Sequence, residues 1–213
     1  MTGIIALQGG GPFAANDDLD RELLREVGVT DRSAGKVVML PTADAFEQPD
    51  RLVTAAAAWA DRLGVAVEPV MVLARHDASD EAAVAAVQSA RAVYLVGDQP
   101  LHLRSVMKDT PLWDAVGDVL AGGGLVVGVG PCASALCDPM VDPRGGAFTL
   151  GLGLITRVAF VGEADQLSAE RLHRTLELAD TTVVCAPVGS ALVRRPNGWT
   201  SVGDLDVHGA LPE

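Results

Sequence analysis

Residues 123–136 constrain the fold more than any other part of the sequence. Their first half is a short apolar run enclosed by glycines, which is typical of a strand buried on both faces of a sheet. The run ends at Gly130-Pro131, and small residues follow Cys132. This order predicts a strand, a sharp turn and the start of a helix, with Cys132 on the turn.

A side chain on such a turn stands above the edge of the sheet, beside a helix N-terminus that favours negative charge. The pKa of a cysteine falls in that environment, so Cys132 is predicted to be an exposed and partly ionised nucleophile. The other interpretation is a structural cysteine in the core, because free cysteine is among the most buried residue types. The local sequence alone favours neither interpretation.

Composition and charge narrow the classes of function. The chain has 213 residues, 49% of them hydrophobic, which is enough for a sizeable core, and we interpret residues 1–213 as one domain. A formal net charge of -12 argues against nucleic acid or an anionic membrane as a partner. The apolar runs are short and the first residues lack a secretory pattern, so neither a membrane span nor a signal peptide is expected.

The pattern of cysteines and histidines predicts neither a disulfide framework nor a metal site. The three cysteines, Cys132, Cys137 and Cys185, are an odd number in a chain without a visible export signal. A disulfide framework is therefore not expected, and the reducing cytoplasm is the predicted location. The four histidines are scattered and no Cys/His cluster has zinc spacing, so neither a metal site nor a cofactor is predicted.

Apolar runs alternate with helical patterns along the first 130 residues. Strands are predicted at 3–7, 36–40, 65–73, 92–96 and 125–129, and helices at 17–27, 48–63, 79–90, 100–108 and 111–121. This alternation predicts an α/β fold with a mainly parallel central sheet flanked by helices on both faces. Beyond residue 138, we expect strands at 157–161, 181–185 and 190–194, a helix at 168–179, and a C-terminal β-hairpin around Asn197-Gly198.

Three turns follow predicted strands and contain glycine or polar residues. In parallel sheets, ligands bind at the carboxyl ends of the strands. The turns are Gly9-Gly10-Gly11, Gly97-Asp98-Gln99 and residues 130–134. Their expected convergence at one edge of the sheet is the physical reason to predict a site there.

The order of short motifs resembles the dipeptidase E and cyanophycinase family of serine peptidases. The matching pieces cover most of the chain: Gly9-Gly10-Gly11, Pro41-Thr42-Ala43, Gly97-Asp98-Gln99, residues 130–135, Gly151-Leu152-Gly153-Leu154, Asp165-Gln166 with Arg171, and Ser190-Ala191-Leu192-Val193. The resemblance implies a class I glutamine-amidotransferase-like, or flavodoxin-like, fold. It also implies a peptidase type of chemistry at the turn after the strand at 125–129.

Three departures from the family pattern fall on the positions that carry its chemistry. The family elbow reads Gly-Thr-Ser-Ala-Gly-Ala, and by this resemblance Cys132 takes the place of its serine and Ser134 that of a glycine. Leu167 occupies the position of the family's histidine base. The run at 187–192 replaces the family's acidic partner and contains no acid. A thiol, unlike a hydroxyl, is partly ionised without a dedicated base.

The resemblance assigns expected roles to individual residues. Cys132 is the expected nucleophile, and His102, close behind the Gly97 turn, is the best candidate for a substitute base. Backbone N–H groups at Gly97 and Ala133 are expected to form an oxyanion hole. The expected substrate-binding residues are Asp98, Gln99, Ser134, Asp165, Gln166 and Arg171, the last as a bidentate partner for a carboxylate.

Three hypotheses for function follow. The first is a cysteine-nucleophile hydrolase or acyltransferase that acts on a small peptide or amide. The second is an inactive homologue that binds a small ligand or a partner through the same pocket. The third is a thiol-based sensor that uses Cys132. Small residues on the helix faces and the late hairpin also lead us to expect a homodimer.

Overall fold

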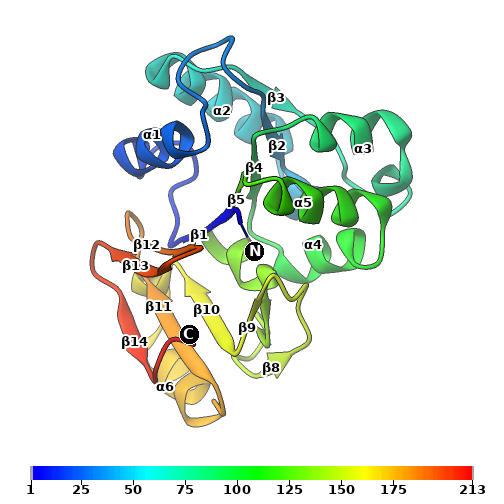
Figure 1. Ribbon diagram of the computed structural model, residues 1–213. Helices are drawn as coiled ribbons and strands as arrows, with labels where there is room; N and C mark the ends of the chain where they lie inside the picture. Colours follow the sequence, from blue (N-terminus) through cyan, green and yellow to red (C-terminus); the bar gives the residue numbers. More distant parts are fainter. Residues whose placement is uncertain (1, 213) are drawn as a thin grey trace.

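A seven-stranded sheet runs through the computed structural model, which describes residues 2–212 (Figure 1). Its order is β13-β12-β1-β5-β4-β2-β3. The strands are β1 (Ile4–Gln8), β2 (Val37–Leu40), β3 (Val67–Pro69), β4 (Ala92–Val96), β5 (Leu125–Val129), β12 (Ala191–Arg195) and β13 (Gly198–Val202). The strands from β1 to β3 in this order pair in parallel, and β12 and β13 add an antiparallel edge. The predicted mainly parallel sheet is confirmed.

Both faces of the central strands are covered, which explains their uninterrupted apolar sequences. Every residue of β1, β4 and β5 is buried. Alternate side chains enter different cores: Ile5 and Leu7 pack into one cluster, and Ile4 and Ala6 into the other. A strand of this kind shows no polar face, so its sequence reads as a short apolar run.

The helices form a layer on each face of the sheet (Figure 1). On one face lie α1 (Asp17–Glu26) and α2 (Pro49–Leu63), and on the other lie α3 (Glu81–Gln88), α4 (Pro100–Met107) and α5 (Pro111–Ala121). Trp59 of α2 is fully buried against the sheet, as is Leu103 of α4. Among residues 2–212, no helix combines the length and the apolar character that crossing a membrane requires.

The second half of the chain builds a smaller sheet below the central one (Figure 1). It consists of β10 (Val158–Gly162), β11 (Thr182–Ala186) and β14 (Asp206–His208), and α6 (Ala169–Glu177) packs on it. Two further pairs are β6 (Cys137–Asp138) with β9 (Ile155–Thr156), and β7 (Met140–Val141) with β8 (Phe148–Thr149). The predicted strands at 157–161 and 181–185 therefore form, but in this separate sheet.

Short 3₁₀ helices connect the main elements. They are η1 (Thr42–Asp44), η2 (Asp77–Ser79), η3 (Gly130–Leu136) and η4 (Ala164–Gln166). The predicted hairpin is confirmed, because Arg195 of β12 lies opposite Gly198 of β13. The turn after β5 leads into η3, a 3₁₀ helix, rather than into the start of an α-helix. Since a 3₁₀ helix has about three residues per turn, it directs its side chains differently from the predicted arrangement.

Candidate functional site

Three central strands end at the same level, and this brings the predicted turns together. Gln8 of β1 and Val96 of β4 both pair with Val129 of β5, and each is the last residue of its strand. The N–H of Cys132 donates to the carbonyl of Gly97 over 3.2 Å, which joins the turn after β5 to the turn after β4. The turns after β1, β4 and β5 therefore converge at one sheet edge, as the sequence predicts.

Gly130 occupies the elbow itself. It is the first residue after β5 and has φ of 72°, the left-handed conformation of a sharp strand-to-helix turn. A Cβ on Gly130 would lie 3.7 Å from Oε1 of Glu163 and 3.8 Å from Cα of Gly10, so it would make only ordinary van der Waals contacts there. The position that projects over the sheet edge thus belongs to a residue without a side chain.

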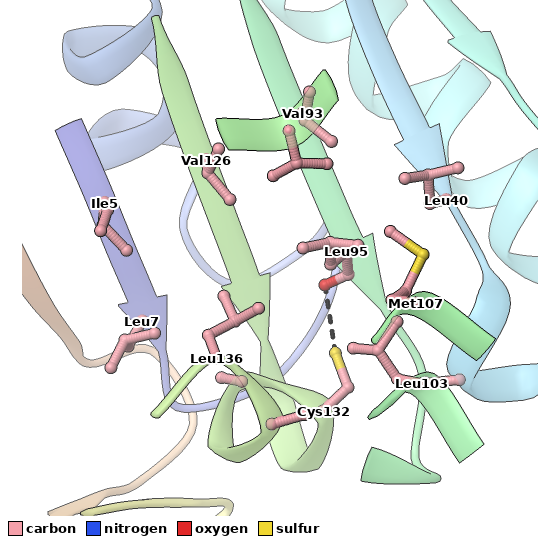
Figure 2. Close-up of a cluster of buried hydrophobic side chains, with 14 of the residues drawn as sticks. Ile5, Leu7, Leu40, Val93, Leu95, Leu103, Met107, Val126, Cys132 and Leu136 are labelled. Carbon is pink, nitrogen blue, oxygen red and sulfur yellow. Dashed lines mark hydrogen bonds between the residues drawn. The ribbon is translucent and has the colours of Figure 1, made fainter. Parts of the chain in front are cut away.

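Cys132 lies below the elbow, inside the core, and the prediction of an exposed nucleophile is wrong. Its side chain is fully buried. Figure 2 shows the sulfur pointing from η3 toward the carbonyl of Leu95, between Leu103 and Leu136. The thiol donates to the carbonyls of Leu95 at 3.1 Å and Val129 at 3.2 Å. Burial, followed by the nearby acids, raises the pKa of Cys132 to about 12.

The side chain of Cys132 points into the core for a simple physical reason. The strand ends at Val129, so the sharp bend falls on Gly130, and the residue two positions later returns toward the sheet. Ser134, two positions further along η3, lines the open side, and its hydroxyl donates to the carbonyl of Pro131 over 2.9 Å. The sequence contains a signal for this arrangement: the apolar run ends at Val129, which predicts that the bend falls on Gly130.

A pocket of about 310 Å³ opens beside the elbow, where the central sheet meets the smaller sheet; we call it the strand-end pocket. Its lining residues are Asp98, Pro100, Pro131, Ser134, Val141, Pro143, Phe160, Val161, Gly162, Glu163, Gln166, Leu167, Arg171 and Thr175. Four predicted substrate-binding residues, Asp98, Ser134, Gln166 and Arg171, lie in this wall. The sequence reasoning missed Glu163, which follows the last residue of β10 just as Gly130 follows β5.

Two carboxyl groups give the pocket its acidic character. Glu163 has φ of 51°, and its N–H donates to the carbonyl of Gly9 over 2.5 Å, which fixes it against the turn after β1. Burial raises the pKa of Glu163, and the charges of Asp98 and Asp165 raise it further. The pKa of Asp98 is also raised, first by burial and then by the charges of Asp44 and Glu47. Both groups therefore favour a proton or a cation beside them.

Arg171 is the one predicted cationic residue in the pocket wall. It lies near the start of α6, where Ser168 accepts a hydrogen bond from the Arg171 N–H at 3.3 Å and caps the helix. The guanidinium donates to the carbonyl of Pro143. This bond ties Arg171 to Pro143, another residue of the pocket wall, and uses only part of the five N–H donors of a guanidinium.

Other predicted site residues lie elsewhere. His102 is not a pocket residue: Nε2 is 2.9 Å from the carbonyl of Leu73, and the ring packs edge-on against Phe46 at 4.7 Å. The prediction that His102 serves as a base is therefore wrong, because α4 turns its ring away. Gln99 lines a neighbouring hollow, and Asp165 instead accepts the Val188 N–H at 3.0 Å.

The backbone donors differ from the predicted oxyanion hole. Elbow hydrolases use the N–H of the residue after the nucleophile as a main donor to the oxyanion. Here Gly130 occupies the elbow position in the structure, so the next residue is Pro131, which has no N–H. Ala133, which the sequence resemblance assigned to this role, is buried in the core cluster with Cys132. The role expected of the Gly97 N–H stays a prediction.

A buried polar network supports the glycine turn from below. Asp20 accepts hydrogen bonds from Gln8 at 2.6 Å, Trp59 at 3.0 Å and Tyr94 at 3.1 Å. Asn16 donates to the carbonyl of Gly10 at 3.3 Å and so ties this network to the pocket rim. Burial dominates over these bonds and raises the pKa of Asp20 to about 6.

Comparisons with known proteins agree with the fold. No family model and no curated protein matches the sequence. Among solved structures, a peptidase from an acI-B1 Actinobacterium superposes with a TM-score of 0.85 at 26% identity, over 98% of this chain and 90% of the other. A protein described as a peptidase E from Listeria monocytogenes EGD-e superposes with a TM-score of 0.68 at 13% identity, over 98% of both chains.

The sheet order, the strand-end elbow and these superpositions define a peptidase-like hydrolase fold. The chain therefore has a peptidase-E-like fold. The resemblance deduced from the sequence motifs is confirmed in the fold and in the similarity to peptidase structures. Among residues 2–212, no three or more His, Cys, Asp or Glu side chains form a group suited to a metal ion.

Proposed function

We propose that this peptidase-E-like protein binds a short peptide or a small amino compound in the strand-end pocket without cleaving it by a nucleophile. The observation that carries the proposal is the sequence of the elbow: Gly130, without a side chain, followed by Pro131, without an N–H. A nucleophilic hydrolase needs a reactive side chain and an oxyanion donor at these two positions.

Cys132 does not replace the missing nucleophile in this proposal. Its sulfur is fully buried, beneath the elbow rather than in the pocket wall. With a pKa of about 12, roughly one thiol in 10⁵ is ionised at neutral pH. The same two properties argue against the thiol-sensor hypothesis, because sensor cysteines combine a low pKa with access to solvent.

The charge of the pocket suggests which part of a ligand is recognised. Burial raises the pKa of Glu163, and Coulomb repulsion from Asp98 raises it further. A protonated amine between them would relieve that repulsion and form charge-assisted hydrogen bonds. Arg171 would hold a carboxylate or carbonyl of the same ligand. A free amino terminus is the simplest group with this chemistry.

Calorimetric titration tests the proposal with dipeptides that carry free or acetylated amino termini. We expect the free dipeptides to bind and acetylation to weaken binding by about tenfold or more, which is the loss of one charge-assisted bond. Glu163→Gln should weaken the free dipeptides similarly, whereas Glu47→Gln, an acid outside this pocket, should not. Equal affinity for free and acetylated peptides would contradict the assignment.

A second candidate function rests on the raised pKa values of Glu163 and Asp98. Two neighbouring carboxyl groups, one protonated and one ionised, can activate a water molecule for amide hydrolysis. We propose the same dipeptides as the test substrates, with product formation followed by chromatography. Cleavage that persists in Cys132→Ala and disappears in Glu163→Gln would favour this candidate, and absence of cleavage would favour simple binding.

A further inference from the structure

A second pocket lies at the opposite end of the central sheet from the elbow. Arg194 of β12 lies opposite Ile5, near the start of β1, whereas the carboxyl end of β1 pairs with the other end of β12. The pocket encloses about 160 Å³ and is lined by Leu154, Ile155, Thr156, Arg157, Arg194, Trp199 and Pro212. It shares no residue with the strand-end pocket.

Two guanidinium groups, those of Arg157 and Arg194, lie in the wall of this pocket. Within residues 2–212, neither Arg157 nor Arg194 has a carboxylate oxygen within 4.0 Å. The next residue along β12 behaves in the opposite way, because Arg195 binds Glu26 at 2.7 Å and Glu22 at 3.2 Å. In a chain with a net charge of -12, a pocket lined by two arginines is a local exception to the overall negative charge.

The surrounding residues hold these cations in place. Trp199 of β13 lies directly opposite Arg194, and its Nε1 donates to the carbonyl of Pro212 at 2.7 Å. The guanidinium of Arg194 lies over the indole ring of Trp199, 5.1 Å from its centroid, which is within the range of a cation–π interaction. Arg157 has φ of 62°, a conformation that non-glycine residues rarely adopt.

We propose that this pocket binds a phosphate group. Two guanidinium groups match the charge of a phosphate at neutral pH, and their planar N–H forks match its oxygens. The pocket volume of about 160 Å³ is well below the ~300 Å³ at which sites for drug-sized ligands begin. It therefore suits a phosphate or a phosphorylated end of a molecule, with the indole beside it.

Calorimetric titration of the full chain at low ionic strength tests the proposal with three probes: inorganic phosphate, phenyl phosphate and acetate. We expect inorganic phosphate to bind one site per chain, and acetate to bind at least about tenfold more weakly because it matches one charge only. Tighter binding of phenyl phosphate would support a phosphorylated molecule as the natural ligand, and equal binding would support free phosphate.

Matched variants keep the test specific. Arg157→Gln and Arg194→Gln should each weaken phosphate binding by about tenfold, and Arg194→Lys should fall between wild type and Arg194→Gln because it keeps the charge and loses the fork. Arg174→Gln removes the same charge from the exposed side of α6 and should leave the affinity unchanged. Melting curves without ligand establish that each variant is folded. Absence of phosphate binding to wild type, or an equal loss in Arg174→Gln, overturns the proposal.

Discussion

Gly130 and Cys132 lie on one short turn, yet they belong to different environments. Gly130 lies beside the pocket that Pro131 and Glu163 line, and it has no side chain to place there. Cys132 has a reactive side chain, and the fold encloses it completely. The comparison teaches that reactive chemistry on an elbow depends on one residue position, because the bend falls on Gly130 and the side chain two positions later enters the core.

The largest effect on stability should come from adding a side chain at Gly162, where the backbone packs closely against Gly130. A Cβ on Gly162 would lie 2.4 Å from the carbonyl oxygen of Gly130, and backbone is unable to move aside cheaply. Gly162→Ala should therefore lower the free energy of unfolding by about 3 kcal/mol or more. Gly130→Ala, whose Cβ would make only ordinary contacts, should cost only about 1 kcal/mol from its positive φ. Urea unfolding of both variants measures the difference, and equal losses would refute the room for a Cβ at Gly130.

Asp20, the buried acid below the turn at Gly9-Gly10-Gly11, is expected to give an effect of intermediate size, a dependence of the free energy of unfolding on pH. The pKa of Asp20 is about 6 in the folded protein, against an ordinary value of 3.8. Between these values the folded chain binds the extra proton, so the Asp20 contribution to the free energy of unfolding falls as pH rises through this window and stays low above it. The change is on the order of 2 kcal/mol.

Asp20→Asn isolates this contribution, because other carboxyl groups change stability with pH in the opposite direction. Asp77 and Asp142 have lowered pKa values, since both accept backbone or arginine hydrogen bonds. Urea unfolding of wild type and Asp20→Asn at about pH 4 and pH 7 therefore gives the informative difference. A difference between the two proteins that is the same at both pH values would show that Asp20 keeps an ordinary pKa.

A smaller effect is expected from removing the buried sulfur. Cys132→Ala deletes the thiol and its contacts with the carbonyls of Leu95 and Val129, so the free energy of unfolding should fall by about 1–2 kcal/mol. Ligand affinity in the strand-end pocket should stay within about twofold of wild type, because this change alters the core alone. A variant with unchanged stability and lost binding would place the sulfur in the pocket after all.

The sequence predicts the central sheet well because its signals are local. The runs at β1, β4 and β5 are apolar at every position, and Asn197-Gly198 marks the hairpin, so neither needs distant information. Side-chain direction at the elbow is different, since moving the strand end by a single residue changes which side chain points outward. Glu163 and Asp20 were missed for a related reason: their roles depend on Gly9, Tyr94 and Trp59, which are distant in the sequence.

Alkylation of Cys132 by iodoacetamide, quantified peptide by peptide with mass spectrometry, tests the central claim most directly. In native buffer we expect labelling slower than that of an unfolded control by about a thousandfold or more, with a rate that follows global unfolding as urea is added. The rate should show no titration near pH 7, because the pKa of the buried thiol is about 12. Rapid labelling of the folded protein with a midpoint below about pH 8 would contradict this account and return Cys132 to the active elbow.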